Sequence, residues 1–277
     1  MPEGDTVWLT AQRLNRALSG KVLTGSDFRV PQLAEVDLAG RTVTETLSRG
    51  KHILTRVEDV TVHSHLKMEG SWHIYRPGTA WRSAAFQARV VLTTSDRQVV
   101  GFRLGALDVI PRDQEHTLVG HLGPDLLGPD WSLEEALRRL GTRPDMPVGE
   151  ALLDQRNLAG IGNMYKAEVC FLRGVHPRTC VGDVDDLAQL VGRAQQLLEV
   201  NKSRAEQSTT GDLRRGNERW VYGRKGKPCR RCGTPIRREI FAAVRDAERR
   251  AAAHGGVEDQ ARESYWCPTC QPEARRR

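Results

Sequence analysis

The residues best suited to chemistry stand near the two ends of the chain. The sequence opens with Met1-Pro2-Glu3-Gly4. If Met1 is removed, Pro2 offers a secondary amine, which attacks a carbonyl carbon such as the C1′ of an opened deoxyribose and gives an iminium without first losing a second proton. Glu3, the next residue, is a ready acid for proton transfer at the same carbon.

Four cysteines near the other end have the spacing of a metal site. Cys229 and Cys232 form one Cys-x2-Cys pair, and Cys267 and Cys270 form a second. Two such pairs can place four thiolates tetrahedrally around one Zn²⁺ at the base of a β-hairpin. A closed site of this kind predicts one structural zinc ion per chain with no part in the chemistry. The weaker alternative is four unliganded buried thiols.

Basic charge is concentrated in the C-terminal part of the chain. Residues 202–277 contain 19 Lys and Arg against 10 Asp and Glu, whereas residues 1–201 contain 23 against 25. This asymmetry indicates a polyanionic partner, with a solvated basic tail as the alternative. No stretch of about 18 apolar residues and no secretion signal is present. We therefore expect a cytoplasmic protein with no membrane partner, and we expect Cys170 and Cys180 to be core residues.

The pattern of apolar residues predicts a β-rich N-terminal part. Asp5 is expected to cap a helix that ends at Gly20. Short β-rich runs follow, separated by turns, and they predict an antiparallel β-sandwich within a domain at residues 1–115. These runs are 42–47, 52–57, 60–65, 86–93 and 98–102.

The rest of the chain is predicted to be mainly helical, which makes the fold class α+β and multidomain. Gly, Pro, His and Asp dominate residues 116–130 and predict a linker. A helical domain is expected at 131–223 and a zinc finger at 224–277. The expected helices cover about 132–140, 148–154, 163–173 and 185–199, the first opened by a Ser132-Leu-Glu-Glu135 capping box.

A glycine-rich turn precedes one of these helices, in Asn157-Leu-Ala-Gly160-Ile-Gly162-Asn163. Two glycines around one apolar residue let the backbone turn tightly and present N–H groups at the helix N-terminus, where a phosphate can bind. Asn163 adds a side-chain donor that can grip a nucleic-acid backbone without reading its sequence. Taken alone, an ordinary helix–helix turn explains the motif more simply.

Together these motifs resemble those of the formamidopyrimidine-DNA glycosylase and endonuclease VIII family of base-excision repair enzymes. They run in family order over nearly the whole chain, although no single one is decisive. The motifs that carry the resemblance are Met1-Pro-Glu-Gly4, Arg49-Gly-Lys51, His65-Leu-Lys-Met-Glu-Gly70, Leu122-Gly-Pro-Asp125, Leu152-Leu-Asp-Gln155, Gly160-Ile-Gly-Asn163-Met-Tyr-Lys-Ala-Glu168, and Val221-Tyr-Gly-Arg-Lys-Gly-Lys-Pro-Cys229 with Cys270-Gln271.

The resemblance implies a monomeric DNA glycosylase with lyase activity, acting on DNA that contains oxidised bases or abasic sites. It implies that Pro2 displaces the damaged base and forms a Schiff base, with Glu3 as its proton donor. Lys51 is implied to grip the phosphate beside the lesion and to assist β-elimination, a solvated turn lysine being the alternative. Arg262, from its separation from Cys267, is implied to bind phosphate and to act in δ-elimination.

Four further residues are implied to contact DNA. Asn163 corresponds to the phosphate-binding asparagine of the family's helix-two-turns-helix motif. Lys67 and Met68 fall where the family inserts side chains into the space left by an everted nucleotide, with a core methionine as the alternative for Met68. His121 is expected to touch DNA from the linker or to be an exposed loop histidine.

Two departures bear on the substrate and on the finger. Residues 233–266 separate the cysteine pairs by more than the family's usual spacing, so an Arg- and Ala-rich insertion occupies the finger. The connection between Asp212 and Trp220 is too short for the loop that encloses oxidised guanine in the formamidopyrimidine type. That favours the endonuclease VIII branch and oxidised pyrimidines, with oxidised purines as the alternative.

Two other protein classes are alternatives. A non-catalytic protein that binds damaged DNA would be expected to lack an exposable Pro2 or Glu3, and both are present. A zinc-ribbon RNA-binding protein would be expected to offer aromatic platforms for unpaired bases, whereas aromatic residues make up 5% of the chain.

Overall fold

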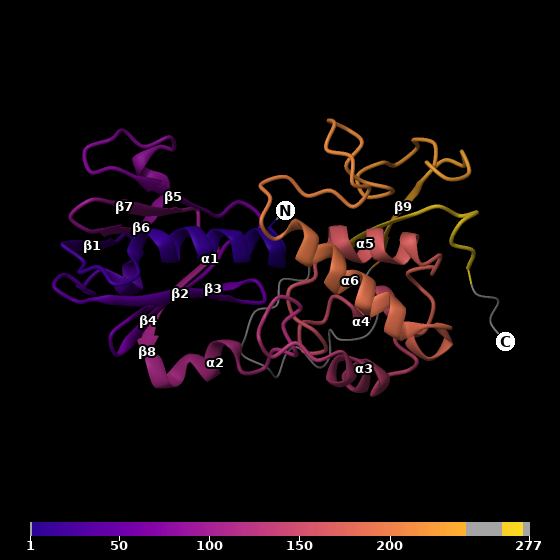
Figure 1. Ribbon diagram of the computed structural model, residues 1–277, viewed down its shortest axis with the longest axis horizontal. Coiled ribbons are helices and arrows are strands. Elements are labelled where there is room, and N and C mark those ends of the chain that lie inside the picture. Colours follow the sequence, from indigo (N-terminus) through magenta and orange to yellow (C-terminus); the bar gives the residue numbers. More distant parts are fainter. Residues whose placement is uncertain (1, 242–261, 274–277) are drawn as a thin grey trace. The chain divides into compact units, whose positions relative to one another are not determined.

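The computed structural model describes residues 2–241 and 262–273, which fall into two compact units (Figure 1). Unit 1 comprises Met1–Ser132, Gln155–Ile161 and Leu198–Ala205. Unit 2 comprises Leu133–Asp154, Gly162–Leu197 and Glu206–Arg277. The glycine-rich turn therefore belongs to the same unit as the N-terminus, up to Ile161.

Helix α1 (Gly4–Leu18) opens unit 1. Its buried apolar residues recur every three or four positions, which gives the helix one core-facing side: Val7, Ala11, Leu14 and Leu18. The predicted Asp5 cap is wrong, because the N-cap is Glu3 and Asp5 lies buried within the first turn. The carbonyl of Glu3 already accepts the N–H of Val7 at 3.0 Å, so the helix begins earlier than the cap signal indicated.

Two four-stranded antiparallel sheets follow this helix in unit 1 and confirm the predicted β-sandwich. One has the order β1-β6-β7-β5 and the other β2-β3-β4-β8. The strands are β1 (Gly25–Phe28), β2 (Val43–Arg49), β3 (His52–Val57), β4 (Val60–His65), β5 (Ser71–Tyr75), β6 (Ala88–Thr93), β7 (Gln98–Phe102) and β8 (Ala106–Pro111). One core joins them to the helix through residues such as Leu14 of α1, Ile53 of β3 and Leu92 of β6.

Three of these strands, β1, β5 and β8, are absent from the sequence-based prediction. All three are edge strands, each paired with one neighbour. An edge strand tolerates residues that a central strand would not, such as Pro111 at the end of β8, which has no N–H to donate. Conversely, Phe86 was expected in a strand and lies in a 3₁₀ turn, 78% exposed.

The start of the expected linker is helical. Helix α2 (Glu115–Val119) is fastened to the second sheet, because the Glu115 carboxylate accepts two hydrogen bonds from Arg56, at 2.8 and 2.7 Å, and one from Thr61 at 2.6 Å. These contacts join residues that are far apart in the chain, so local composition could not reveal them.

Unit 2 contains α3 (Leu133–Gly141), α4 (Val148–Ala151), α5 (Asn163–Leu172) and the greater part of α6 (Leu187–Asn201). Helix α4 is shorter than expected. Strands β9 (Arg237–Phe241) and β10 (Arg262–Trp266) pair antiparallel, as expected of a hairpin between the cysteine pairs. The rest of the insertion, 242–261, lies outside the described residues. Among the helices of the described ranges, none is long and apolar enough to span a membrane.

Candidate active site and metal site

The segment that begins α1 touches the glycine-rich turn. The N–H of Gly4 donates to the carbonyl of Gly160 at 2.8 Å. A Cβ on residue 4 would lie 2.9 Å from Gly160 Cα, so only glycine fits at this approach. Beside it, the Glu3 side chain is fully buried and Pro2 is partly exposed, while Met1 lies outside the described residues. The residue predicted to act as an acid is thus buried and directly follows the predicted nucleophile in the chain.

Gln155 holds the turn in shape. Its Oε1 accepts the N–H of Gly160 at 3.0 Å, and its Nε2 donates to the carbonyl of Ile161 at 3.1 Å. Its own carbonyl accepts the N–H of Gly123 at 2.8 Å. Gln155 belongs to one of the motifs that carry the family resemblance, but its role in the turn could not be predicted from the sequence.

Lys51 follows a turn that is held by a buried carboxyl group. Gly50, between β2 and β3, has φ +57° and donates its N–H to Asp125 Oδ2 at 2.7 Å. The other oxygen of Asp125 accepts the N–H of Leu127 at 3.1 Å. Burial raises the pKa of the Asp125 carboxyl, against the lowering effect of these hydrogen bonds. The backbone that leads into Lys51, just before β3, is therefore held by a residue from the Leu-Gly-Pro-Asp motif.

A hydrogen-bonded chain of histidines lies beside Lys51. His63 Nδ1 lies 2.8 Å from Asp108 Oδ2, and His63 Nε2 lies 2.8 Å from His52 Nδ1. An ionised Asp108 only accepts, so in the neutral chain His63 donates from Nδ1 and accepts at Nε2. Burial, together with the charges of neighbouring histidines and of Lys51, lowers the pKa of His52 to about 3.

This histidine cluster had no role in the sequence analysis, although a signal was present. His63 and His65 are two residues apart on β4 and so point to the same face. The register of β3 and β4 places His52 opposite His65. Burial first, and then the charges of Lys51, His63 and Lys67, lower the pKa of His65 to about 4.

Of the remaining predicted DNA contacts of unit 1, Lys67 and Met68 directly follow this cluster in the chain, and His121 lies against it in the fold. Lys67 and Met68 lie in the turn between β4 and β5. Met68 is 49% exposed, which excludes the core alternative. His121 is exposed, with its ring edge-on to that of His52 at a centroid distance of 6.5 Å.

In unit 2, Asn163 is joined to the hairpin. As the first residue of α5, it donates from Nδ2 to the carbonyl of Glu263 at 2.7 Å. Its Oδ1 is buried and has no hydrogen-bond partner among the described residues. Arg262 begins β10, its backbone paired with Phe241, while its side chain lies outside the described part of the chain.

A fully buried carboxylate, Glu168 of α5, was also missed as a structural centre. It accepts the N–H groups of Trp220, Val221 and Tyr222, each at 2.8 Å, and the hydroxyl of Thr209. Three consecutive backbone donors on one carboxylate fix the segment that leads into the first cysteine pair.

The four paired cysteines converge as expected. Their sulfur atoms all lie within 4.8 Å of one another, with separations that include 3.4 Å between Cys232 and Cys267 and 3.9 Å between Cys229 and Cys270. A disulfide needs about 2.05 Å. Zinc–sulfur bonds of about 2.3 Å in a tetrahedron separate the sulfurs by about 3.8 Å. The cluster is therefore able to hold a metal ion.

The other two cysteines are not part of this cluster. Cys170 is fully buried in α5, and burial raises the pKa of its thiol to about 12, as befits an inert core residue. Cys180 is only partly buried, so the expected core position applies to Cys170 alone.

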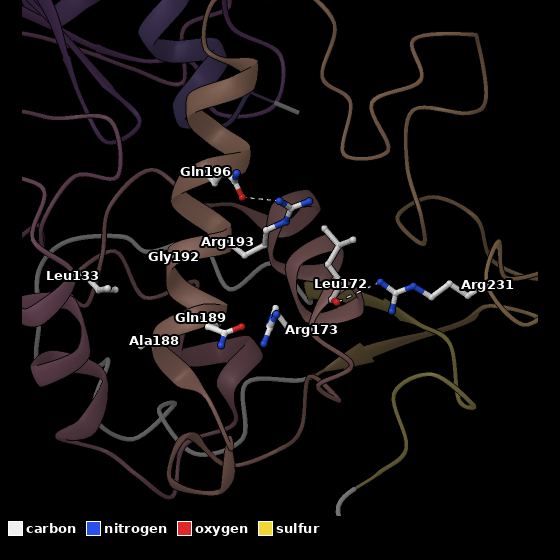
Figure 2. A pocket seen from close by; sticks show the side chains of 9 residues that line it. All are labelled: Leu133, Leu172, Arg173, Ala188, Gln189, Gly192, Arg193, Gln196 and Arg231. Atoms are coloured by element: carbon white, nitrogen blue, oxygen red, sulfur yellow. Dashed lines mark hydrogen bonds between the residues drawn. The ribbon is translucent and has the colours of Figure 1, made fainter.

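A separate groove of about 710 Å³ lies in unit 2 (Figure 2). Its lining includes three arginines, Arg173, Arg193 and Arg231. Leu172, the last residue of α5, also lines it. Asn163 is the first residue of that helix, so the groove and the predicted phosphate-binding residue mark opposite ends of α5. None of the residues that line the groove is a predicted site residue.

Comparisons with known proteins cover nearly the whole chain. Residues 1–104 match the family model described as formamidopyrimidine-DNA glycosylase N-terminal domain, and residues 122–210 match the formamidopyrimidine-DNA glycosylase H2TH domain. A probable endonuclease 8 2 of Streptomyces coelicolor is 54% identical over 275 residues, which cover 98% of this chain and 94% of the relative. The DNA-(apurinic or apyrimidinic site) lyase Nei2 of Mycolicibacterium smegmatis is 47% identical, with 98% and 99% covered.

Solved structures agree on the fold. Formamidopyrimidine DNA glycosylase of Lactococcus lactis, non-covalently bound to DNA containing an abasic site, is similar with a TM-score of 0.77 at 22% identity. The similarity covers 98% of this chain and 100% of that one. A MutM structure in complex with DNA containing carbocyclic 8-oxo-G gives a TM-score of 0.78 at 23% identity, with 98% and 100% covered.

Proposed function

The chain belongs to the formamidopyrimidine-DNA glycosylase and endonuclease VIII family, and we propose that it is a bifunctional DNA glycosylase and abasic-site lyase of base-excision repair. The observation that carries this proposal is the burial of Glu3, the residue that follows Pro2, in a segment whose backbone is held against the glycine-rich turn by the contact between Gly4 and Gly160. A non-catalytic relative would have no need to bury an acid next to its terminal amine.

The chemistry follows from a neutral secondary amine. An α-amino group has a pKa of about 7.7 to 8.0, so part of the Pro2 amine is unprotonated at neutral pH. Its lone pair bonds to C1′ of the damaged nucleotide, the bond from C1′ to the base breaks, and Glu3 supplies the proton that the leaving group needs. The Pro2 nitrogen then loses its proton, and its lone pair forms a C=N bond as the C1′–O4′ bond breaks and O4′ takes up a proton, which opens the sugar. The resulting iminium (Schiff base) acidifies C2′, and transfer of a C2′ proton to a base expels the 3′ phosphate by β-elimination.

Cationic and amide groups would hold the DNA backbone during these steps. Lys51 is positioned by Asp125 through Gly50, and a lysine so fixed can pair with the phosphate beside the lesion. Asn163 uses one Nδ2 hydrogen for the Glu263 carbonyl and has a second for a phosphate oxygen. Arg262 is proposed as a phosphate contact that also serves in δ-elimination, and His121 as a further contact.

We propose that Cys229, Cys232, Cys267 and Cys270 hold one Zn²⁺. A closed four-thiolate site supplies shape and no open coordination position, so the ion would fix the start of β9 relative to the end of β10. That arrangement would secure the strand on which Arg262 lies.

We further propose oxidised pyrimidines as the preferred bases. The connection before Trp220 closes on itself: Thr209 N–H donates to the carbonyl of Glu218 at 2.8 Å, and Thr210 Oγ1 donates to that of Asn217 at 2.7 Å. A segment so engaged is poorly suited to fold over a bicyclic base. Pyrimidines that have lost aromatic planarity also leave the base stack at low cost. Oxidised purines remain the second candidate.

We also propose an oligomeric state, a cellular location and a division of the chain into domains. A repair enzyme of this kind would act as a monomer in the cytoplasm. Within the sequence we assign catalysis to 1–115, a linker to 116–130, DNA binding to 131–223 and the zinc finger to 224–277.

Borohydride trapping tests the function directly. With an oligonucleotide that carries an abasic site, we expect one protein per DNA, with the adduct mapping to residue 2. An adduct on a lysine, or none in protein shown to lack Met1, would contradict the mechanism. Single-turnover rates on 5-hydroxyuracil, thymine glycol and 8-oxoguanine opposite cytosine test the base preference, and faster release of 8-oxoguanine would contradict that part alone.

A further inference from the structure

The turn between β4 and β5, residues 66–70, is closed by its own backbone. The N–H of Gly70 donates to the carbonyl of Leu66 at 2.9 Å. A Cβ on residue 70 would lie 2.5 Å from that carbonyl oxygen, so the closure requires glycine. Leu66 is 3% exposed and Met68 is 49% exposed. The turn thus anchors one apolar side chain in the core and presents another to solvent.

Lys67, between these two residues, has an unusual backbone conformation. Its φ of +48° lies in the left-handed region, which is unfavourable for residues other than glycine. Its N–H donates to Nδ1 of His65 at 2.9 Å, two residues earlier in the chain. Its side chain runs over Gly105, where a Cβ would lie 2.5 Å from Lys67 Cγ and Cδ. Both the backbone and the side-chain direction of Lys67 are therefore specified.

His65 is itself held firmly. Its carbonyl accepts the N–H of Gly105 at 2.9 Å, and its ring packs edge-on to that of His52 at a centroid distance of 5.0 Å. The titratable groups that face it are Lys51, His52, His63 and Lys67. Burial, together with the charges of the two lysines, lowers the pKa of His65 to about 4, so the imidazole is neutral near neutral pH. A neutral ring with its proton on Nε2 leaves Nδ1 free to accept.

We propose that His65 is a positioning residue for opening the DNA duplex: its Nδ1 holds the Lys67 backbone in the left-handed conformation and so keeps Met68 presented as a preformed wedge. This inference rests on the proposed function, in which the turn enters the space left by an everted nucleotide. A wedge that is ordered before binding loses less conformational entropy on insertion. Without it, eversion from a stacked duplex should slow, whereas an unpaired base needs no wedge.

The experiment compares His65→Asn with His65→Leu. The two side chains have nearly the same shape, and Asn Oδ1 replaces the Nδ1 acceptor whereas Leu removes it. Base release is measured under single-turnover conditions on one lesion, in duplex and in single-stranded DNA. We expect His65→Leu to lower the duplex rate about tenfold relative to His65→Asn, the size of one ordinary hydrogen bond, with equal rates on single strands.

A second reporter covers the case in which single strands are not cleaved. With 2-aminopurine beside a non-cleavable tetrahydrofuran site in a duplex, insertion unstacks the reporter and raises its fluorescence. The rise should be slower with His65→Leu than with His65→Asn. The control is His73→Phe. It removes a ring nitrogen in β5 that hydrogen-bonds to the Ser71 hydroxyl and makes no contact of this kind with the 66–70 turn. It should match the parent protein.

A backbone rescue makes the test specific. Glycine adopts positive φ freely, so Lys67→Gly should make the turn independent of His65. The difference between His65→Leu and His65→Asn should shrink in the Lys67→Gly background. A full difference there, or an equal loss on duplex and single strands, would overturn the proposal.

Met68→Ala separates this inference from the proposed function. If Met68→Ala leaves the duplex rate and the fluorescence unchanged, the turn does not insert and the assigned role of Met68 fails. If Met68→Ala slows insertion while His65→Leu and His65→Asn behave alike, only the positioning role of His65 is overturned.

Discussion

The buried carboxyl of Asp125 accepts the N–H of Gly50 at 2.7 Å, across a separation of 75 residues. Asp125→Asn keeps the shape but replaces one accepting oxygen by an N–H₂ group, which cannot accept from Gly50 or Leu127. Leaving a buried donor unpaired costs about 1–3 kcal/mol. We expect a loss of that size in urea unfolding, and a lower rate of nicking at abasic sites because Lys51 is displaced. A variant with parental stability and nicking would show that the contact does not hold the Lys51 turn.

Glu3→Gln separates base release from strand nicking. Glutamine cannot donate a proton as an acid, and general acid catalysis is typically worth about 10²- to 10⁴-fold. Release of an oxidised pyrimidine should fall by that factor, while nicking at a preformed abasic site should fall much less. Single-turnover assays on the two substrates measure both rates. Equal losses on both would assign Glu3 to the lyase step as well.

Cys267→Ser should remove the metal. Protein purified without chelator is expected to contain about one zinc per chain, and loss of one thiolate from a closed site should release it together with DNA binding. Metal analysis and binding to abasic-site DNA provide the readouts. Cys180→Ser is the matched control, since Cys180 lies outside the cluster. A metal-free Cys267→Ser protein with full binding would mean that the hairpin is stable without zinc.

Asn163→Ala and Arg262→Ala should weaken binding to all sequences alike, because phosphate contacts carry no sequence information. For Arg262→Ala the slope of log affinity against log salt should fall by about one. Asn163→Ala removes no charge and should leave that slope unchanged. Titrations at several salt concentrations measure both. A change in base preference alone would contradict the phosphate assignment.

Stability should fall as the pH drops from about 6.5 toward 4. In the folded protein the pKa values of His52 and His65 are lowered to about 3 and about 4 from 6.5, so in this window the unfolded chain binds more protons. Each group contributes up to about 1.4 kcal/mol per pH unit. Urea unfolding measured at several pH values near 5 gives the slope of the unfolding free energy against pH. This slope should be smaller for His65→Leu than for the parent protein by about that amount. The cysteine cluster is the same in both proteins, so the difference isolates the histidine.

The family and most of the local elements could be predicted from residue types and spacing. Strands β3 and β4 begin and end where alternating β-formers and turn residues place them, and α5 begins at Asn163 as expected. The four cysteines were identified from spacing alone, because a Cys-x2-Cys pair is a local signal whose geometry needs little context. The exposure of Met68 could be learned only from the structure, since a wedge methionine and a core methionine look alike in sequence.

The contacts that support the site could not be predicted from the sequence, because they join distant parts of the chain. Asp125 reaches Gly50, Glu168 gathers three N–H groups from 52 to 54 residues away, and His52 meets His63 through the pairing of two strands. Each of these contacts joins a polar side chain to a partner distant in the chain. The pattern of hydropathy along the sequence does not identify that partner. Burial makes these hydrogen bonds necessary for stability, because a polar group removed from water must find its hydrogen-bond partners within the fold.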